Sequence, residues 1–164
     1  MGISAFLCIF VEKIALISYI FYFDLINYFT VKKMFHGISS LSLDSKGRIT
    51  VPVKYRPLLV PNGLTYLAIV ESNFGCLVMM PHNIWTERTR ILLKSGTEIE
   101  KRFWIGLSDT PELDKFGRVL SAPMLRSGAN INKEIVMLGV GENLEIWDAK
   151  RLGRHKEIVR AKNE

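Results

Sequence analysis

Residues 43–49 read LDSKGRI, and residues 113–119 read LDKFGRV. A leucine, an aspartate, a glycine, an arginine and a β-branched residue recur in the same order, seventy positions apart, and Arg56 and Arg126 match at that same offset. So many matches within a few residues indicate an internal repeat, in which one structural unit occurs twice. The chain is therefore expected to contain two copies of one small unit, each built around this motif.

The motif itself is typical of a tight turn between two strands. Asp44 can accept hydrogen bonds from backbone groups two residues further on, and Gly47 permits a positive φ. Asp114 and Gly117 occupy the same places in the second copy. A proline follows each motif, and proline favours the first turn of a helix. We therefore expect strand, turn, strand and short helix in both copies.

Each motif is followed by a pair of apolar runs joined by a short turn, a pattern that predicts a hairpin. The runs are residues 65–70 with 76–80, and residues 134–140 with 144–147. A helical segment follows each hairpin, over residues 83–93 with Asn83 as the N-cap, and over residues 148–160. Trp85 and Trp147 are expected to be core anchors rather than residues that stack on a ligand.

The two copies span residues 34–95 and residues 96–164, the second ending in the C-terminal helix. A unit of this size buries little apolar surface alone. We therefore expect the two copies to share one core, related by a pseudo-two-fold axis. The fold class expected from these elements is α+β and mainly β, with short helices.

Residues 1–33 differ in composition from the rest of the chain and are rich in Phe, Ile and Tyr. Residues with AT-rich codons dominate this segment, which indicates translated upstream DNA and makes Met34 the expected true first residue. The alternative is a membrane anchor, but Glu12, Lys13 and Asp24 leave too short an uninterrupted apolar run to span a bilayer. Mass spectrometry of the native protein, which identifies its N-terminal residue, distinguishes these alternatives.

The charge balance and the motif together point to a polyanionic partner. The chain carries 22 Lys and Arg against 16 Asp and Glu, a formal net charge of +6, which attracts phosphate backbones and anionic membranes. Lys46 and Arg48 in the first turn, and Lys115 and Arg118 in the second, form two basic points related by the repeat. Arginine in such a turn can bind phosphate or the O6 and N7 of guanine. We therefore assign DNA contacts to these four residues.

The aspartate of each motif allows two interpretations. Asp44 and Asp114 each precede their arginine by four residues, close enough across a tight turn to orient the guanidinium toward DNA. Alternatively, each pair only ties its own turn together as an ordinary surface salt bridge. The duplication of the motif in a basic chain favours the DNA interpretation.

The sequence carries no recognisable motif of the common catalytic classes. It lacks His-Glu-x-x-His, the P-loop pattern and Gly-x-Ser-x-Gly, and residues 139–141 are interpreted as a strand end and its turn. Cys8 and Cys76 form neither a disulfide framework nor a metal pattern with the histidines, and Cys76 is expected in the core. We expect no catalytic residue, no cofactor, no metal and no small-molecule substrate.

The paired motif resembles that of the MraZ family, and the resemblance extends over essentially all of residues 34–164. The residues that carry it are Met34-Phe35-His36-Gly37, residues 43–52, Arg56, Pro81 with Trp85, residues 113–118 and residues 144–148. The spacing of the two motifs makes the resemblance specific. It also supports Met34 as the start, because these proteins usually open on a Met-Phe-x-Gly of this kind.

The resemblance implies a particular architecture and function. It implies a swapped-hairpin, AbrB-like β-barrel whose halves form an intramolecular pseudo-dimer, and assembly into a homo-oligomeric ring. It implies a cytoplasmic, nucleoid-associated, sequence-specific regulator that binds short direct repeats in double-stranded DNA and represses the division and cell-wall gene cluster, with no membrane partner. The alternative is an antitoxin-like protein-interaction and autoregulatory module of the same fold, which a long disordered toxin-binding tail would mark.

The functional arginine of the family falls on Arg48 and Arg118. Two positions depart from the family pattern: His36 stands where an arginine is common, and Phe116 takes the place that matches Lys46. The second turn is therefore expected to contact DNA through Lys115 and Arg118, or to pack partly against a neighbouring molecule.

Overall fold

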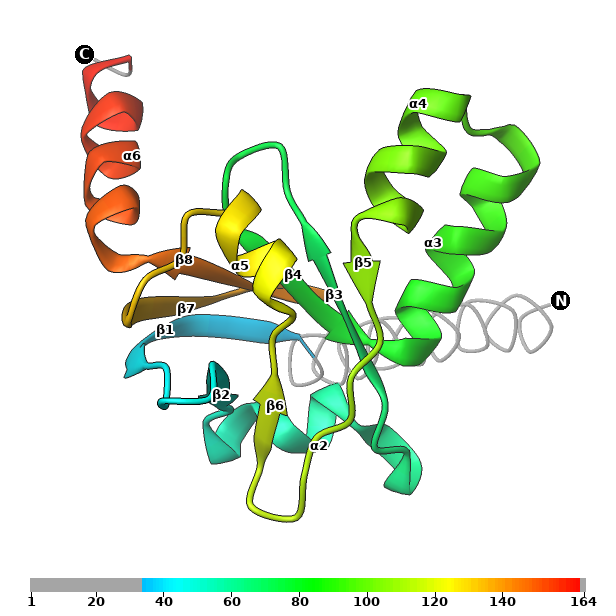
Figure 1. Ribbon diagram of the computed structural model, residues 1–164, viewed down its shortest axis with the longest axis horizontal. Helices are drawn as coiled ribbons and strands as arrows, with labels where there is room; N and C mark the ends of the chain where they lie inside the picture. The colour runs from blue at the N-terminus through cyan, green and yellow to red at the C-terminus, as the bar shows by residue number, and fades with distance from the viewer. Residues whose placement is uncertain (1–33, 163–164) are drawn as a thin grey trace, which may run out of the picture. The chain divides into compact units, whose positions relative to one another are not determined.

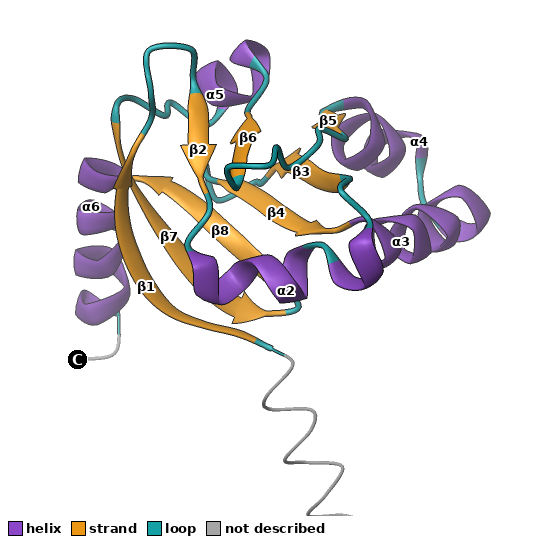
Figure 2. Ribbon diagram, turned by 90° about the horizontal axis from the view of Figure 1, so that it is seen from below, coloured by secondary structure: helices purple, strands orange, loops and turns teal. Residues whose placement is uncertain are grey.

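An antiparallel sheet forms the centre of the fold in the computed structural model, which describes residues 34–162 (Figure 1). The expectations for residues 1–33 lie outside the described residues. Six strands cross the sheet in the order β1 (Phe35–Ser42), β7 (Glu134–Gly141), β8 (Asn143–Asp148), β4 (Leu77–Pro81), β3 (Leu67–Glu71) and β5 (Ser108–Asp109). Two further strands, β2 (Arg48–Thr50) and β6 (Arg118–Leu120), pair only with each other and form a separate antiparallel ribbon, seen side by side in Figure 2.

Strand pairing interleaves the N-terminal half (residues 34–95) with the C-terminal half (residues 96–162). β1 pairs with β7 along its whole length, from Phe35 opposite Gly141 to Ser42 opposite Glu134. β4 pairs with β8, β3 with β5, and β2 with β6, so each of these ladders also joins one half to the other. Within the described residues, neither half forms a sheet of its own beyond a single hairpin.

The sheet is buried on both faces over its central strands. Along β3, the side chains of Leu67 and Ile69 enter one apolar cluster, while those of Ala68 and Val70 enter a second cluster on the opposite face. A strand buried on both faces has no polar face, which explains the continuous apolar runs in the sequence. The first cluster takes residues from both halves, so the expectation of a shared core is met in this part of the chain.

The second cluster contains Trp85 and Trp147, which are 7% and 3% exposed, as expected of core anchors. Cys76 lies in the same cluster, fully buried. Burial raises the pKa of its thiol to about 12. Cys76 is therefore an unreactive core residue, as its sequence context predicts.

Helical segments surround the sheet. They are η1 (Val53–Tyr55), α2 (Arg56–Leu59), η2 (Pro61–Gly63), α3 (His82–Ser95), α4 (Glu98–Glu100), the π-helical η3 (Lys101–Gly106), α5 (Pro123–Gly128) and α6 (Ala149–Ala161). Of these, α3 and α6 are long and the others short. The side chain of Asp148 caps α6 by accepting hydrogen bonds from the N–H groups of Lys150 and Arg151, at 3.0 and 3.2 Å. The expected N-cap at Asn83 is wrong, because α3 begins at His82 and the N-cap position falls two residues earlier, on Pro81, which makes no side-chain capping hydrogen bond.

The sheet is open. β1 and β5 are its two edges, and no ladder between them closes it within residues 34–162. The closed barrel implied by the family resemblance is therefore absent from this part of the chain, while the α+β class with a predominance of sheet is confirmed. β2 and β6 are each only three residues long, and they pair with one another instead of extending the main sheet. Nor does any helix of residues 34–162 combine the length and the apolar character that crossing a membrane requires.

Candidate nucleic-acid interface

The two motifs fold into turns with the same hydrogen bonds. In the first turn, Oδ1 of Asp44 accepts from the N–H groups of Lys46 and Arg48, each at 2.9 Å, and the N–H of Gly47 donates to the Asp44 carbonyl at 2.9 Å. In the second, Oδ1 of Asp114 accepts from the N–H groups of Phe116 and Arg118, both at 2.9 Å. The aspartate of each motif thus builds its turn through backbone bonds.

The second carboxylate oxygen of each aspartate holds the arginine of the motif. Nε of Arg48 donates to Oδ2 of Asp44 at 2.6 Å, and Nε of Arg118 donates to Oδ2 of Asp114 at 2.9 Å. Both arginine side chains are 29% exposed. The guanidinium groups are therefore fixed in direction while part of each still faces solvent.

These contacts keep both carboxyl groups ionised. The hydrogen bond from the N–H of Arg48 is the main cause that lowers the pKa of Asp44 to about 2, and the Arg48 guanidinium adds to it. Partial burial of Asp114 acts in the opposite direction, but the hydrogen bonds from Arg118 and Phe116 still lower its pKa. Each turn therefore keeps its carboxylate–guanidinium pair at neutral pH.

The antiparallel ribbon of β2 and β6 places the two turns at its opposite ends, because each turn leads into the start of its own strand. Ile49 lies opposite Val119 in the register, and both are fully buried. Because side chains alternate along a strand, the flanking Arg48 and Arg118 lie on the opposite, outward side of the ribbon. The sequence-predicted arginines therefore come together on one outward surface. Lys46 and Lys115, within the turns themselves, are exposed.

A second pair of arginines, Arg56 and Arg126, packs against the turn glycines, and each arginine comes from the half of the chain that does not contain the turn it contacts. Gly47 and Gly117 have φ values of +78° and +76°. A Cβ built on Gly47 would overlap the guanidinium of Arg126, and one built on Gly117 would overlap that of Arg56. The sequence showed that Arg56 and Arg126 match at the repeat offset, but their crossed placement depends on the interleaving of the halves and carries no local signal.

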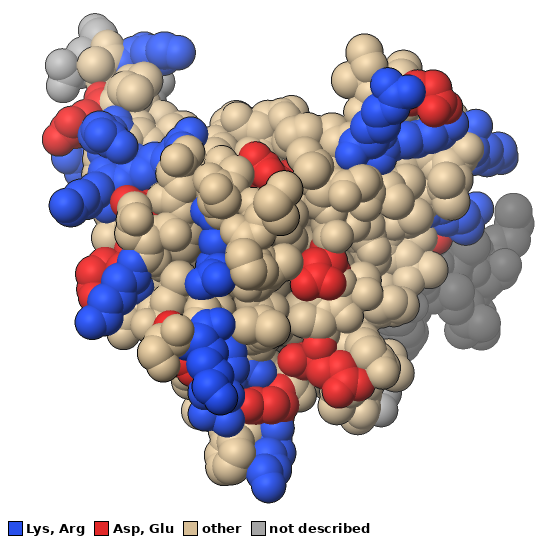
Figure 3. Space-filling model, in the orientation of Figure 1, with Lys and Arg blue, Asp and Glu red and all other residues tan. Residues whose placement is uncertain are grey.

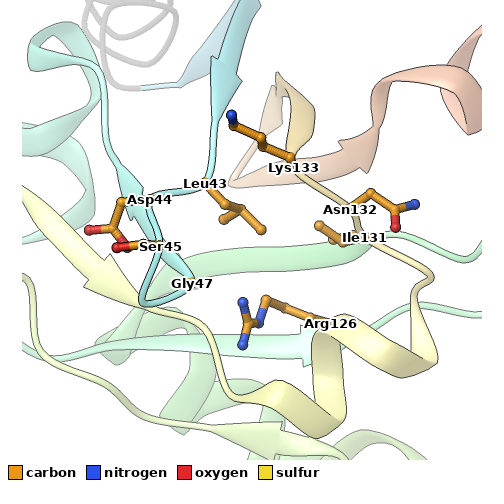
Figure 4. A pocket seen from close by; sticks show the side chains of 8 residues that line it. All are labelled: Leu43, Asp44, Ser45, Gly47, Arg126, Ile131, Asn132 and Lys133. Carbon is orange, nitrogen blue, oxygen red and sulfur yellow. The ribbon is translucent and has the colours of Figure 1, made fainter.

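The two crossed arginines differ in their hydrogen bonds. Nε of Arg56 donates to the carbonyl of Val51 at 2.9 Å, whereas Nε of Arg126 is buried without a partner among the described residues. Arg126 lines a pocket of about 510 Å³ beside the first turn, together with Leu43, Asp44, Ser45, Gly47, Ile131, Asn132 and Lys133. Figure 4 shows the Arg126 guanidinium beneath Gly47 and the Asp44 carboxylate directed away from the pocket. The pocket therefore adds two cationic side chains beside the first turn.

Phe116 distinguishes the second turn from the first. Its side chain is 59% exposed, and the guanidinium carbon of Arg118 lies 4.7 Å from the centre of its ring. The ammonium of Lys115 lies 5.2 Å from the same ring. Phe116 thus remains on the surface of the chain and supports both cations of its turn from one side.

Charge on the face shown in Figure 3 is unevenly distributed. Lys and Arg side chains gather over α6, below it over the region of the β2–β6 ribbon, and in a separate group over α3 and α4. No group of three or more His, Cys, Asp or Glu side chains in residues 34–162 is placed to hold a metal ion. Through its lysine and arginine side chains, this surface can bind anions.

Comparisons with known proteins agree with the motif. The sequence model of a family described as "MraZ protein, putative antitoxin-like" matches residues 106–156. The chain is 42% identical over 118 residues to the transcriptional regulator MraZ of Polaromonas sp., an alignment that covers 71% of this chain and 83% of that protein. It is 36% identical over 121 residues to the protein of the same name from Herminiimonas arsenicoxydans, with 73% and 85% covered. The chain belongs to the MraZ family of transcriptional regulators.

Proposed function

We propose that this protein is a sequence-specific DNA-binding regulator of transcription, which acts at the nucleoid in the cytoplasm. Membership of a family of transcriptional regulators supports the general role. The observation that carries DNA binding is the pair of outward arginines, Arg48 and Arg118, held in one ribbon by their own aspartates. Lys46 and Lys115 contact phosphates, and the arginines read base edges or phosphates in the major groove.

The proposed targets are short direct repeats in the promoter of the division and cell-wall gene cluster, which the protein represses. The two halves act as AbrB-like repeats related by a swapped hairpin, and two observations support this arrangement. Both turns make the same hydrogen bonds, and the ladders β1–β7, β4–β8 and β2–β6 each join one half to the other. One chain then presents two similar turns in a fixed relation.

Binding is expected to depend steeply on salt, because the proposed contacts neutralise phosphates. Each neutralised phosphate contributes a slope of about −0.9 in log affinity against log salt, so four contacts per chain give roughly −3 to −4. Fluorescence anisotropy of a duplex carrying the repeats, titrated at several salt concentrations, measures this slope. Affinity that stays constant between low and moderate salt contradicts the proposal.

The protein is also proposed to assemble into a homo-oligomeric ring. A single pair of turns makes few base contacts, whereas a ring aligns several pairs with repeated boxes and raises the effective concentration of each. Light scattering on the purified protein is expected to give the mass of a large oligomer. A strict monomer that binds one isolated box tightly would contradict the ring.

The second candidate is an antitoxin-like module that binds a protein partner, which the description of the matching family favours. The two candidates differ in what the turns do. For a module that works only through a protein partner, replacing Arg48 and Arg118 leaves regulation of the target promoter unchanged. For the DNA-binding regulator, the same replacements abolish it.

A further inference from the structure

The C-terminal helix α6 concentrates positive charge that the two turns do not use. Its basic residues, with the lysine that follows it, are Lys150, Arg151, Arg154, Lys156, Arg160 and Lys162, and Glu157 is its only acidic residue. None of these charged side chains forms a salt bridge with another described residue. Charge on this helix is therefore uncompensated within residues 34–162.

The helix is attached to the fold by its first turns only. Leu152 is its one buried residue, and the ring of His155 stacks on Trp147 with 4.9 Å between the ring centres. From Lys156 onward every described residue is exposed. The last two turns of α6 therefore contribute little to the core.

The sequence of α6 works against its own stability. Lys150 with Arg154, and Lys156 with Arg160, are like-charged pairs four residues apart, and such pairs destabilise a helix. Gly153 in the helix interior weakens it further. The Asp148 cap and Glu157 offset part of these costs, and a polyanionic partner explains the remaining excess of cations on the exposed turns.

The surface of α6 fits nucleic acid better than a lipid surface. A helix that lies in a membrane interface needs a broad apolar face with large side chains. The large exposed apolar residues of α6 are Ile158 and Val159, and cations lie around the remaining surface. The cations of α6 and those of the ribbon both appear on the face in Figure 3, where one extended duplex can meet them.

We propose that α6 is a second DNA-binding element, which contacts the phosphate backbone beside the site of the turns and adds affinity without sequence preference. This inference rests on the proposed function, because it places α6 on the flank of the same bound duplex. The turns supply the choice of sequence, and α6 supplies salt-sensitive attraction to whichever DNA lies there.

The test compares two double variants of the full chain that each remove one lysine and one arginine. The first is Lys156→Gln with Arg160→Gln in α6, and the control is Lys94→Gln with Arg102→Gln, which are exposed on α3 and η3 and form no salt bridge with a described residue. Anisotropy titrations use a long duplex that carries the repeats and a scrambled duplex of equal length. Because both variants lose the same net charge, any difference between them reports a local contact.

The α6 variant is expected to lose about two units of salt slope, which is roughly ten- to sixty-fold in affinity at 0.1 M salt. Its ratio of affinities for the repeats and the scrambled duplex stays at the wild-type value, and the control loses less than half as much slope. Equal losses in the two variants overturn the role of α6 while leaving the proposed function intact. Binding to vesicles of half anionic lipid that disappears in the α6 variant, with DNA binding unchanged, also overturns it. A wild-type protein that binds neither duplex refutes the proposed function itself.

Discussion

Replacing Arg48 with alanine is expected to weaken binding to the promoter repeats strongly while leaving the protein folded. A lost bidentate base contact corresponds to about 1–3 kcal/mol, or about 5- to 150-fold in affinity, and the loss multiplies over the chains of an assembly. The turn itself survives, because Oδ1 of Asp44 bonds to the backbone N–H groups of residues 46 and 48, which alanine keeps. Gel shifts measure the affinity, and a thermal melt measures the stability.

Three variants serve as controls for this prediction. Arg118→Ala is expected to weaken binding no more than Arg48→Ala, since Phe116 rather than a lysine precedes its turn glycine. Arg48→Lys keeps the charge but loses the forked geometry, so it retains salt-dependent binding and loses preference for the repeats. Asp44→Ala removes both backbone bonds and is expected to lower the melting temperature more than Arg48→Ala does. Two results would show that Asp44 and Arg48 only stabilise their turn: wild-type DNA affinity in the Arg48 variant, or equal destabilisation by Asp44→Ala and Arg48→Ala.

Replacing Gly139 with alanine is expected to destabilise the whole fold. Gly139 in β7 lies opposite Gly37 in β1, and a Cβ at Gly139 would overlap the backbone of Phe35 and His36. Backbone cannot rotate aside as a side chain can, so β1 must move away from β7. Overpacking of this kind costs about 1–3 kcal/mol or more. Because β1 leads directly into the first turn, DNA affinity is expected to fall together with the melting temperature.

Gly153→Ala is the matched control for this substitution. A Cβ at Gly153 meets no atom within 4 Å, and the residue lies inside α6. Alanine is expected to stabilise the protein there by about 0.5–1 kcal/mol, because it removes the entropic cost of a helical glycine. Thermal melts of both variants beside the wild type test the pair. An unchanged melting temperature in the Gly139 variant contradicts the close approach of β1 and β7.

Features set by a few neighbouring residues could be predicted from the sequence. The turn at residues 44–47 forms because Asp44 and Gly47 supply the acceptor and the positive φ that such a turn needs. The hairpins and α6 also lie within a few residues of their expected limits. In these cases the determining contacts are local.

The α4–η3 segment is not among the elements predicted from the sequence, although the sequence carries a capping signal for it. Thr97 accepts a hydrogen bond from the N–H of Glu100, and the Glu100 carboxylate accepts one from the N–H of Thr97. This capping box is visible in the sequence as Thr-x-x-Glu. The segment is short and carries no long apolar period, so a search for apolar periodicity alone passes over it.

The open sheet and the crossed arginines depend on contacts distant in sequence. Whether a sheet closes is decided by the lengths and pairing of strands far apart in the chain, and β2 and β6 turn out to pair only with each other. Likewise, Arg126 reaches Gly47 only because α5 is brought beneath the first turn by the ladders between the halves. No pattern within either half records these contacts.

The interleaved ladders also have a kinetic consequence. Phe35 in β1 pairs with Gly141 in β7, which lies far downstream in the sequence. During synthesis, β1 therefore leaves the ribosome long before β7 exists. Proteins dominated by such high contact order fold slowly, because the loop must close before the pairing stabilises it. Until then β1 exposes an unpaired edge that can add to another nascent chain. Refolding of this protein is therefore expected to be slow for its size and sensitive to protein concentration.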